Sequence, residues 1–328
     1  MRDWRYRLAE QRGTLLALGI FLAMFVIYVS KHPAGFTANV VQTAANKGVL
    51  LALVAMAQTL VVLTAGIDLS VGMTFIFTNC LASYIVAGSA ATALLGVVGV
   101  LAVGLACGAI NGMIVIYGRL QPIVTTIATG SIYYGIALWL RPQPGNSDNF
   151  NSDIADLMTG QLPGGIPVSL AALLFIVLAI WVPFRRSAIG RAVYATGSSE
   201  VAAYMSGVPI RRAKFAAYSL SGLLAATGGL YVTFITYSGE ASFANGGTYT
   251  LYSIAAVVLG GVSLFGGVGS AVGAIFGAFA FRTIGDLLFV FDLEPLWQPL
   301  FQGVVLLLAV CIGATRLFQI RNRLDLFG

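Results

Sequence analysis

Residues 66–72, GIDLSVG, place one carboxylate between two glycines in the middle of a strongly apolar region. An aspartate at the centre of a membrane helix costs roughly 2.5–3.5 kcal/mol. Asp68 therefore needs a turn, a set of backbone amides or a water-filled cavity around it. The flanking glycines predict that the helix breaks here. Asp68 is also the one candidate for coupling to protons or sodium ions, a task that usually relies on buried acids.

Other residues that could do chemistry are few. The single histidine, His32, excludes histidine dyads and multi-histidine metal sites. Cys80, Cys107 and Cys311 lie in apolar runs without metal-ligand spacing, which predicts small core residues. The chain has no GxxxxGK[ST] stretch for nucleotide phosphates and no closely spaced pair of acids within the membrane. We therefore expect no enzyme activity, no cofactor and no metal site.

Membrane helices must position these residues. The chain of 328 residues is 58% hydrophobic and 9% charged, against about 25% charged in soluble domains. Several uncharged runs can each cross a hydrocarbon core of about 30 Å. We expect an all-α polytopic membrane protein, a single transmembrane domain over residues 1–328. About ten spans are predicted, at 14–31, 48–65, 71–88, 91–117, 122–140, 166–184, 213–235, 248–261, 267–290 and 298–315.

The basic residues predict the orientation. Most of them fall in the N-terminus 1–13, at Arg119, in and beside the loop 185–212, and in the tail 316–328. Ten spans with both termini in the cytoplasm place all of these on the cytoplasmic side. The loop 141–165, rich in Pro, Gly, Asn and Asp, then lies outside, and we expect one short helix in it. The net charge of +6 reflects topology and anionic lipid, and does not indicate nucleic-acid binding.

The cytoplasmic loop 185–212 contains a short helix with clear end signals. Ser198 or Ser199 can cap its start, Glu200 suits the positive end of its dipole, and Gly207 ends it. Such a helix is either a docking element or an ordinary connector on the membrane surface. The residues alone leave both alternatives open.

Two glycine patterns concern helix breaks and helix packing. Residues 258–264 weakly repeat the pattern of residues 62–69, because in both an apolar run reaches a glycine-bounded turn. Paired breaks of this kind indicate a translocation pathway; shared composition is the alternative. Glycines spaced four residues apart in the fourth and ninth spans predict close helix packing, with substrate contact as the alternative. They are Gly104, Gly108, Gly112, Gly269, Gly273 and Gly277.

Four stretches resemble permease subunits of ribose-, xylose- and galactose-type ABC importers. They are GIDLSVG at 66–72, Gly190 and RAVYATG at 191–197 with the residues that follow to 208, LGGVSLFGGVGS at 259–270, and QPIVTTIAT at 121–129. The resemblance covers roughly residues 40–315. Two positions depart from it: Ser198 and Ser199 stand where family members usually have Gly-Asn, and Thr126 stands where they have a second apolar residue.

The resemblance implies the function and the partners. A permease of this type pairs with a second copy or a similar permease in the bacterial inner membrane. Cytoplasmic ATP-binding subunits hydrolyse ATP, and a periplasmic sugar-binding protein delivers a pentose or hexose for transport by alternating access. A stand-alone secondary carrier or channel for a small polar solute is the alternative. The short cytoplasmic helix would be the coupling helix that docks on the ATPase, with residues Ser198, Ser199, Glu200, Ala202, Ala203, Tyr204, Ser206 and Gly207.

A monosaccharide needs a polar but uncharged route. We expect amide and hydroxyl side chains from the apolar spans to line it, although each could instead hold two helices together. Asp68 lies in the same region, where a cap on backbone amides is favoured over sugar contact. Arg282 and Asp286, one turn apart, predict either an ion pair near the external mouth or a snorkelling arginine. The pathway candidates are Asn46, Gln58, Asp68, Ser70, Asn79, Asn111, Thr125 and Thr129.

Overall fold

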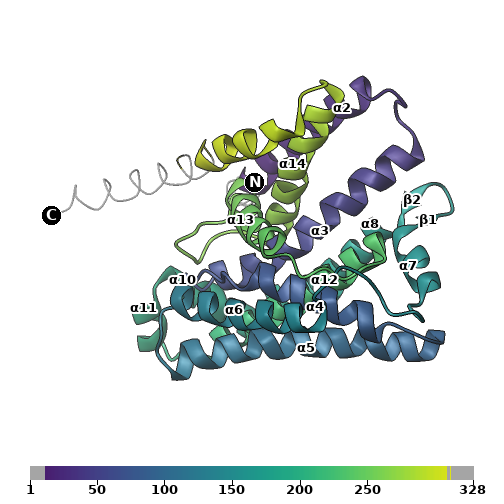
Figure 1. Cartoon of the computed structure of the whole chain (residues 1–328). Coiled ribbons are helices and arrows are strands. Elements are labelled where there is room, and N and C mark those ends of the chain that lie inside the picture. The colour runs from purple at the N-terminus through teal and green to yellow at the C-terminus, as the bar shows by residue number, and fades with distance from the viewer. Residues whose placement is uncertain (1–11, 309–310, 312–328) are drawn as a thin grey trace.

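The computed structural model describes residues 12–308 and residue 311, and this part of the chain is mainly helical (Figure 1). The longer helices are α2 (Arg12–Lys31), α3 (Ala38–Val62), α4 (Val71–Ile85), α5 (Ala90–Tyr117), α6 (Pro122–Leu140), α12 (Ile210–Thr236), α13 (Phe243–Leu259) and α14 (Ala271–Val290). The shorter elements are α7 (Ser152–Thr159), β1 (Gln161–Leu162), β2 (Ile166–Pro167), α8 (Val168–Ile176), the π-helix η1 (Val177–Trp181), α9 (Val182–Arg186), α10 (Ala188–Ser198), α11 (Glu200–Met205) and the 3-10 helix η2 (Pro295–Trp297).

Seven helical stretches are long and apolar enough to cross a membrane, so the chain is an all-α polytopic membrane protein. Helices also occupy the three remaining predicted intervals, but they are shorter. They are α4 with 15 residues, α13 with 17, and Gln298–Leu308 within the predicted span 298–315. Helix α4 begins at one glycine-bounded turn and α13 ends at the other. The predicted tail 316–328 and nearly all of the N-terminus 1–13 lie outside the described residues.

Hydroxyl side chains set the starts of several helices. Thr37, Ser89, Ser242 and Ser270 each accept a hydrogen bond from a backbone N–H in the first turn of α3, α5, α13 and α14. Such caps satisfy amides that have no partner within the helix. The start of α6 instead has Pro122, which has no N–H to satisfy. The helix limits therefore follow from local sequence.

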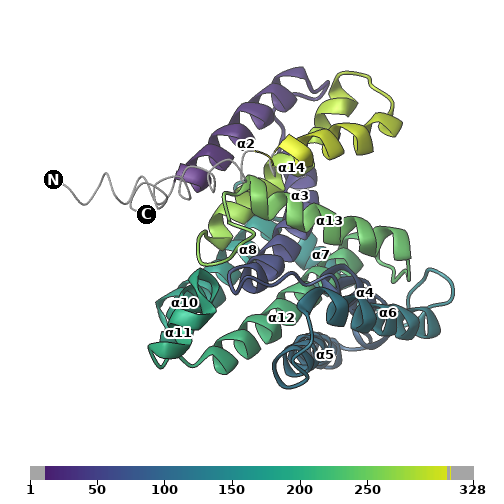
Figure 2. The same ribbon diagram turned by 90° about the vertical axis from the view of Figure 1, so that its left-hand side faces the viewer.

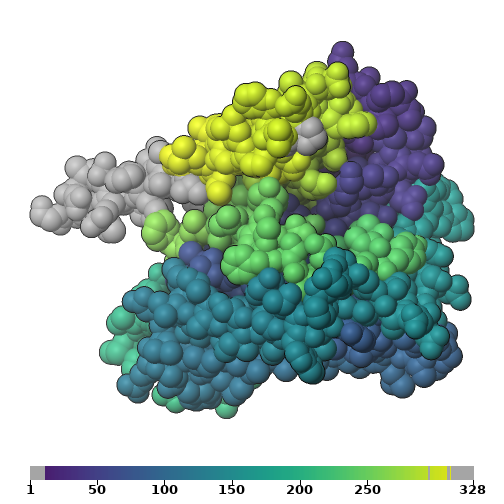
Figure 3. All heavy atoms as spheres, viewed as in Figure 1, coloured from purple at the N-terminus to yellow at the C-terminus, as the bar shows by residue number. Residues whose placement is uncertain are grey.

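Helix α3 forms the centre of the structure. In the most apolar stretch of α3, 89% of the residues are buried. The corresponding share is 11% for α2 and 22% for the span that contains α8 and α9. Helices α12, α13 and α14 pack around α3, and α5 packs along α12. Seen from the end that carries α10 and α11, the helices spread around this centre (Figure 2). In Figure 3, α2 (purple) and the segment after α14 (yellow) lie on one side of α13, and α5 and α6 (blue to teal) on the other.

The glycine row of α5 and the glycines Gly273 and Gly277 of α14 are packing surfaces, whereas Gly269, predicted in the same row, lies in the turn before α14 with a φ of +127°. A Cβ on Gly108 would lie 2.1 Å from the carbonyl oxygen of Tyr218 in α12, and one on Gly277 would lie 2.1 Å from that of Ala256 in α13. Backbones approach this closely only where no side chain separates them. Of the cysteines, Cys80 and Cys107 are buried as predicted, while Cys311 is exposed.

The two hydrophilic segments lie at opposite ends of the molecule (Figure 1). Helices α10 and α11 form one end, and α7 with the β1–β2 hairpin forms the other. The short helix expected in the loop 141–165 is α7, which confirms that expectation. The span that joins the two ends is irregular: Val182 donates its N–H to Val177, five residues earlier, just before Pro183.

Candidate functional site

Asp68 is buried, and Ser70 holds its carboxylate. Asp68 Oδ1 accepts hydrogen bonds from the backbone N–H of Ser70 at 2.9 Å and from Ser70 Oγ at 2.6 Å. Ser70 Oγ accepts in turn from Asn111 Nδ2 at 2.7 Å, and Asn111 Oδ1 accepts from the Tyr133 hydroxyl at 3.2 Å. Helices α5 and α6 are thus linked to the break between α3 and α4. The carboxylate closes a local turn on its own following residue.

Two threonines bind further amides of this break. Leu69 donates its N–H to Thr126 Oγ1 in α6 at 2.9 Å, and Gly72 donates to Thr250 Oγ1 in α13 at 3.1 Å. Thr126 is fully buried, so this departure from the family pattern serves the break. Sequence reasoning did not find Thr250, because no local signal connects it to a residue 178 positions away.

The two glycine-bounded breaks contact each other. The first break is the segment 63–70 between α3 and α4, and the second is the segment 260–270 between α13 and α14. Gly267 of the second break donates its N–H to the carbonyl oxygen of Leu63 in the first break, at 3.1 Å. Gly197, near the end of α10, packs against both: a Cβ there would lie 1.9 Å from Leu63 O and 2.5 Å from Gly267 N. We call this contact of Leu63, Gly197 and Gly267 the junction.

The short cytoplasmic helix of the sequence prediction is α11, which is shorter than the segment 198–207. Ser199 is its cap, since Ser199 Oγ accepts from the N–H of Ala202 at 3.3 Å. Ser198 is instead the last residue of α10. Gly207 follows with a φ of +73°, a left-handed conformation that suits glycine.

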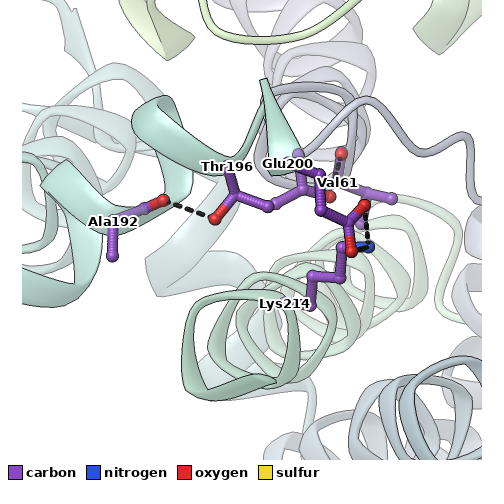
Figure 4. Close-up of polar contacts among 6 residues, drawn as sticks. Val61, Ala192, Thr196, Glu200 and Lys214 are labelled. Atoms are coloured by element: carbon purple, nitrogen blue, oxygen red, sulfur yellow. Dashed lines mark hydrogen bonds and ion pairs between the residues drawn. The ribbon is translucent and has the colours of Figure 1, made fainter. Parts of the chain in front are cut away.

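One face of α11 is apolar and open, and the helix is tied to the next span by an ion pair. Val201, Tyr204 and Met205 are 75%, 74% and 80% exposed. Glu200 accepts from Lys214 of α12 through both carboxylate oxygens, each at 2.8 Å (Figure 4). The carboxylate therefore fixes α11 on α12 in addition to its place in the first helical turn. Ala203, predicted with this set, is buried beneath the helix, and Ala202 and Ser206 are exposed.

Two pathway candidates fasten the end of the molecule that carries α7. Asn46 Nδ2 donates to the carbonyl oxygen of Thr159 at 3.1 Å, which ties α3 to α7. Asn79 Nδ2 donates to the carbonyl oxygen of Ser238 at 2.9 Å, and its Oδ1 accepts from the N–H of Glu240 at 2.9 Å. These two amides lie apart from the Asp68 network, and their hydrogen-bonding groups are used for packing.

Gln58 and Thr125 differ from the other candidates because their polar atoms lack partners. Gln58 is fully buried, and within the described part of the chain neither its amide oxygen nor its nitrogen has a hydrogen bond. Thr125 Oγ1 is likewise buried and unpartnered, whereas Thr129 Oγ1 donates to the carbonyl oxygen of Thr125 at 3.1 Å. The hydroxyls of Tyr218 and Ser221 in α12 are also buried without a hydrogen-bond partner among the described residues. Buried polar groups without partners are rare and costly, so these atoms have capacity for another ligand.

Arg282 and Asp286 were predicted to form an ion pair or to include a snorkelling arginine, and the ion pair within 4 Å that Asp286 forms is with Lys47. Asp286 Oδ1 lies 3.7 Å from Lys47 Nζ of α3. Within residues 12–308, Arg282 has no ion pair inside 4 Å, yet its positive charge acts on Asp286 as well as that of Lys47. The sequence could not show this, because Lys47 reaches Asp286 only through the packing of α3 on α14.

The long apolar helices define a multi-pass membrane protein, and the two glycine-bounded breaks and the exposed helix α11 are its distinctive features. Residues 40–310 match the family described as branched-chain amino acid transport system / permease component, so the chain belongs to this family. It is a multi-pass protein of the bacterial inner membrane and a permease subunit of an ABC importer. Such an importer also contains ATP-binding subunits and a substrate-binding protein.

Similar proteins of known name include two ribose permeases. The ribose import permease protein of Escherichia coli strain K12 is 34% identical over 307 residues, 93% of this chain and 94% of the relative. That of Bacillus subtilis strain 168 is 34% identical over 316 residues, covering 92% and 93%. The autoinducer 2 import system permease protein of Enterobacter sp. strain 638 is 31% identical over 299 residues, covering 89% and 84%. No solved structure matches the chain.

Proposed function

We propose that the chain moves a monosaccharide of the pentose or hexose class from the periplasm to the cytoplasm by alternating access. In this proposal ten helices cross the membrane and both termini lie in the cytoplasm. Separate cytoplasmic subunits hydrolyse ATP. A second copy of the chain, or a similar permease, completes the pathway, and a periplasmic sugar-binding protein delivers the substrate to the end that carries α7.

The polar groups of the interior support a sugar over an amino acid. Two of the relatives are named for ribose, while the family description names branched-chain amino acids. A zwitterionic amino acid carries two charges whose burial is costly unless charged groups or helix-terminus dipoles replace the lost water. The candidate set consists of amides and hydroxyls, and its one carboxylate, on Asp68, is already bound by Ser70. Hydroxyl groups of a sugar suit Gln58 and Thr125, whose side chains have no partners among the described residues.

The junction is the observation that carries the proposed mechanism. Ser199 alone separates α10 from α11, so a displacement of α11 is transmitted directly to Gly197. Gly197 touches both breaks through backbone atoms, which cannot rotate away as a side chain can. Docking of an ATP-binding subunit on the exposed face of α11 would therefore move the ends of α3 and α13 together. The shorter helices α4 and α13 can then change the side on which the pathway opens.

In this mechanism Asp68 stabilises the backbone conformation of the first break. Its carboxylate holds Ser70, and the neighbouring amides of Leu69 and Gly72 bind threonines of α6 and α13. A rigid turn transmits a displacement without unfolding. Sugar contact is assigned to the unpartnered groups, with Gln58 as the first residue to test.

Reconstitution in proteoliposomes tests this function. The permease is combined with its ATP-binding subunits and its binding protein, and uptake of labelled ribose, xylose, galactose and leucine is measured. We expect ATP-dependent uptake of a sugar that also requires the binding protein. Gln58→Ala should lower this uptake while the protein still inserts, whereas Ser131→Ala, at an exposed position of α6, should leave it unchanged.

Two results would contradict the proposal. Uptake of leucine without any sugar would overturn the substrate class. Sugar uptake driven by an ion gradient in the absence of ATP-binding subunits would establish a secondary carrier instead.

A further inference from the structure

A cavity of about 360 Å³ lies between α2, α14, α3 and α8, away from the Asp68 network. Its wall is built mainly from hydrocarbon and aromatic groups, including Phe21 and Phe25 of α2, Phe279 of α14 and Leu173 of α8. Helix α2 and the span that contains α8 are the least buried of the candidate spans. The cavity is therefore bounded on two sides by helices at the lipid-facing periphery.

One end of the cavity is charged. Along α14 its lining runs from Ile275 and Phe279 to Arg282 and Asp286, so the polar groups gather towards the end of this helix. Asp286 is paired with Lys47 at 3.7 Å. Arg282, in contrast, has neither a hydrogen bond nor an ion pair within 4 Å in the part of the chain that the structure describes. Two cations with one anion leave a net positive charge beside an apolar chamber.

We propose that this cavity holds an acyl chain of a membrane phospholipid, whose phosphate pairs with Arg282. A guanidinium suits a phosphate because its N–H groups match two oxygens. A methylene chain suits the phenylalanine wall, which offers no partner for the hydroxyls of a sugar. The chamber thus lies outside the sugar route. The lipid would complete the packing of α2 and α14 on α3 and supply a second anion where Arg282 and Lys47 share Asp286.

Photolabelling of the complete importer in nanodiscs tests this site. The probe is a phosphatidylglycerol that carries a diazirine in its acyl chain, and labelled peptides are mapped by mass spectrometry. We expect labelling of peptides from α2 and α14 around Phe21 and Phe279. Ala44→Phe, which places a ring in the cavity, should reduce this labelling at least fivefold. Arg282→Gln should reduce it at least twofold, and Arg282→Lys should restore most of it.

Matched controls separate the site from general lipid contact. Ala128→Phe changes an exposed alanine of α6 and Arg119→Gln removes an exposed cation, so neither should alter labelling at Phe21 and Phe279. The elution volume and the thermal midpoint of each variant confirm that it is folded. Labelling spread evenly over the exposed helices, or unchanged in Ala44→Phe, would overturn the site. Unchanged labelling in Arg282→Gln would overturn the phosphate contact, and crosslinks to a second permease copy would identify the cavity as a subunit interface.

Discussion

Substitution of Gly197 by alanine tests the junction most directly. The added Cβ would lie 1.9 Å from the carbonyl oxygen of Leu63 and 2.5 Å from the amide nitrogen of Gly267. Both are backbone atoms, so no rotamer change can relieve the contact. The end of α10 must move away from the two breaks, because overpacking of an interior forces backbone shifts.

The cost follows from the same contacts. Overpacking of an interior by one carbon typically costs about 1–3 kcal/mol. The displacement also strains the hydrogen bond from Gly267 to Leu63, 3.1 Å long, and such a bond contributes about 0.5–1.5 kcal/mol. Because both effects arise from one displacement, we expect a total loss of about 1–3 kcal/mol in stability.

Transport and stability are measured on the same preparation. Gly197→Ala should lower the thermal midpoint and reduce the number of sugar molecules imported per ATP hydrolysed, because α11 no longer moves the breaks in step. Gly135→Ala is the matched control, since a Cβ there meets no atom within 4 Å. A normal midpoint would refute the tight contact. A lowered midpoint with a normal ratio of sugar to ATP would show that the junction is structural only.

Three further substitutions test the network and α11. Ser70→Ala should destabilise the protein by about 1–3 kcal/mol, because Asp68 loses its 2.6 Å hydrogen bond in a buried site. An unchanged unfolding midpoint would refute the structural role of Asp68 in the first break. Thr126→Val should lower the stability by a similar amount, roughly 1–3 kcal/mol, because the partly buried N–H of Leu69 loses its acceptor. Faster hydrogen exchange of the Leu69 amide would detect this loss. Glu200→Lys should uncouple ATP hydrolysis from uptake, because the new lysine repels Lys214. The double variant with Lys214→Glu should restore coupling. If it does not, the ion pair is not needed for coupling.

The spans could be predicted from sequence because each is a local property. An apolar run of sufficient length forms a helix in the membrane whatever surrounds it, and a hydroxyl before the run caps it. The break at Asp68 and the helix after Ser199 were predicted for the same reason. The choice between Ser198 and Ser199 could not be made, since either hydroxyl has the right spacing and only the end of α10 decides it.

The partners of the polar groups could not be predicted. Thr126 and Leu69 are 57 positions apart, and their contact depends on how α6 packs beside α4. An amide in an apolar helix has the same sequence signature whether it faces a pathway or another helix. Asn79 is fully engaged in packing, while Gln58 is buried without a partner. Only the three-dimensional arrangement separates the two.

The hydrogen bonds around Asp68 indicate where the proposed motion takes place. The first break is held by Ser70, Thr126 and Thr250 from its own segment, α6 and α13, so bending within it would leave several buried polar groups unpaired at once. At the junction one hydrogen bond joins the two breaks, and one more joins α10 to the second break, from the Tyr194 hydroxyl to the carbonyl oxygen of Gly269 at 2.7 Å. Because the first break has more hydrogen bonds than the junction, α3 and α13 are favoured to move as units. The contact at Gly197 is then where movement of α11 acts on them.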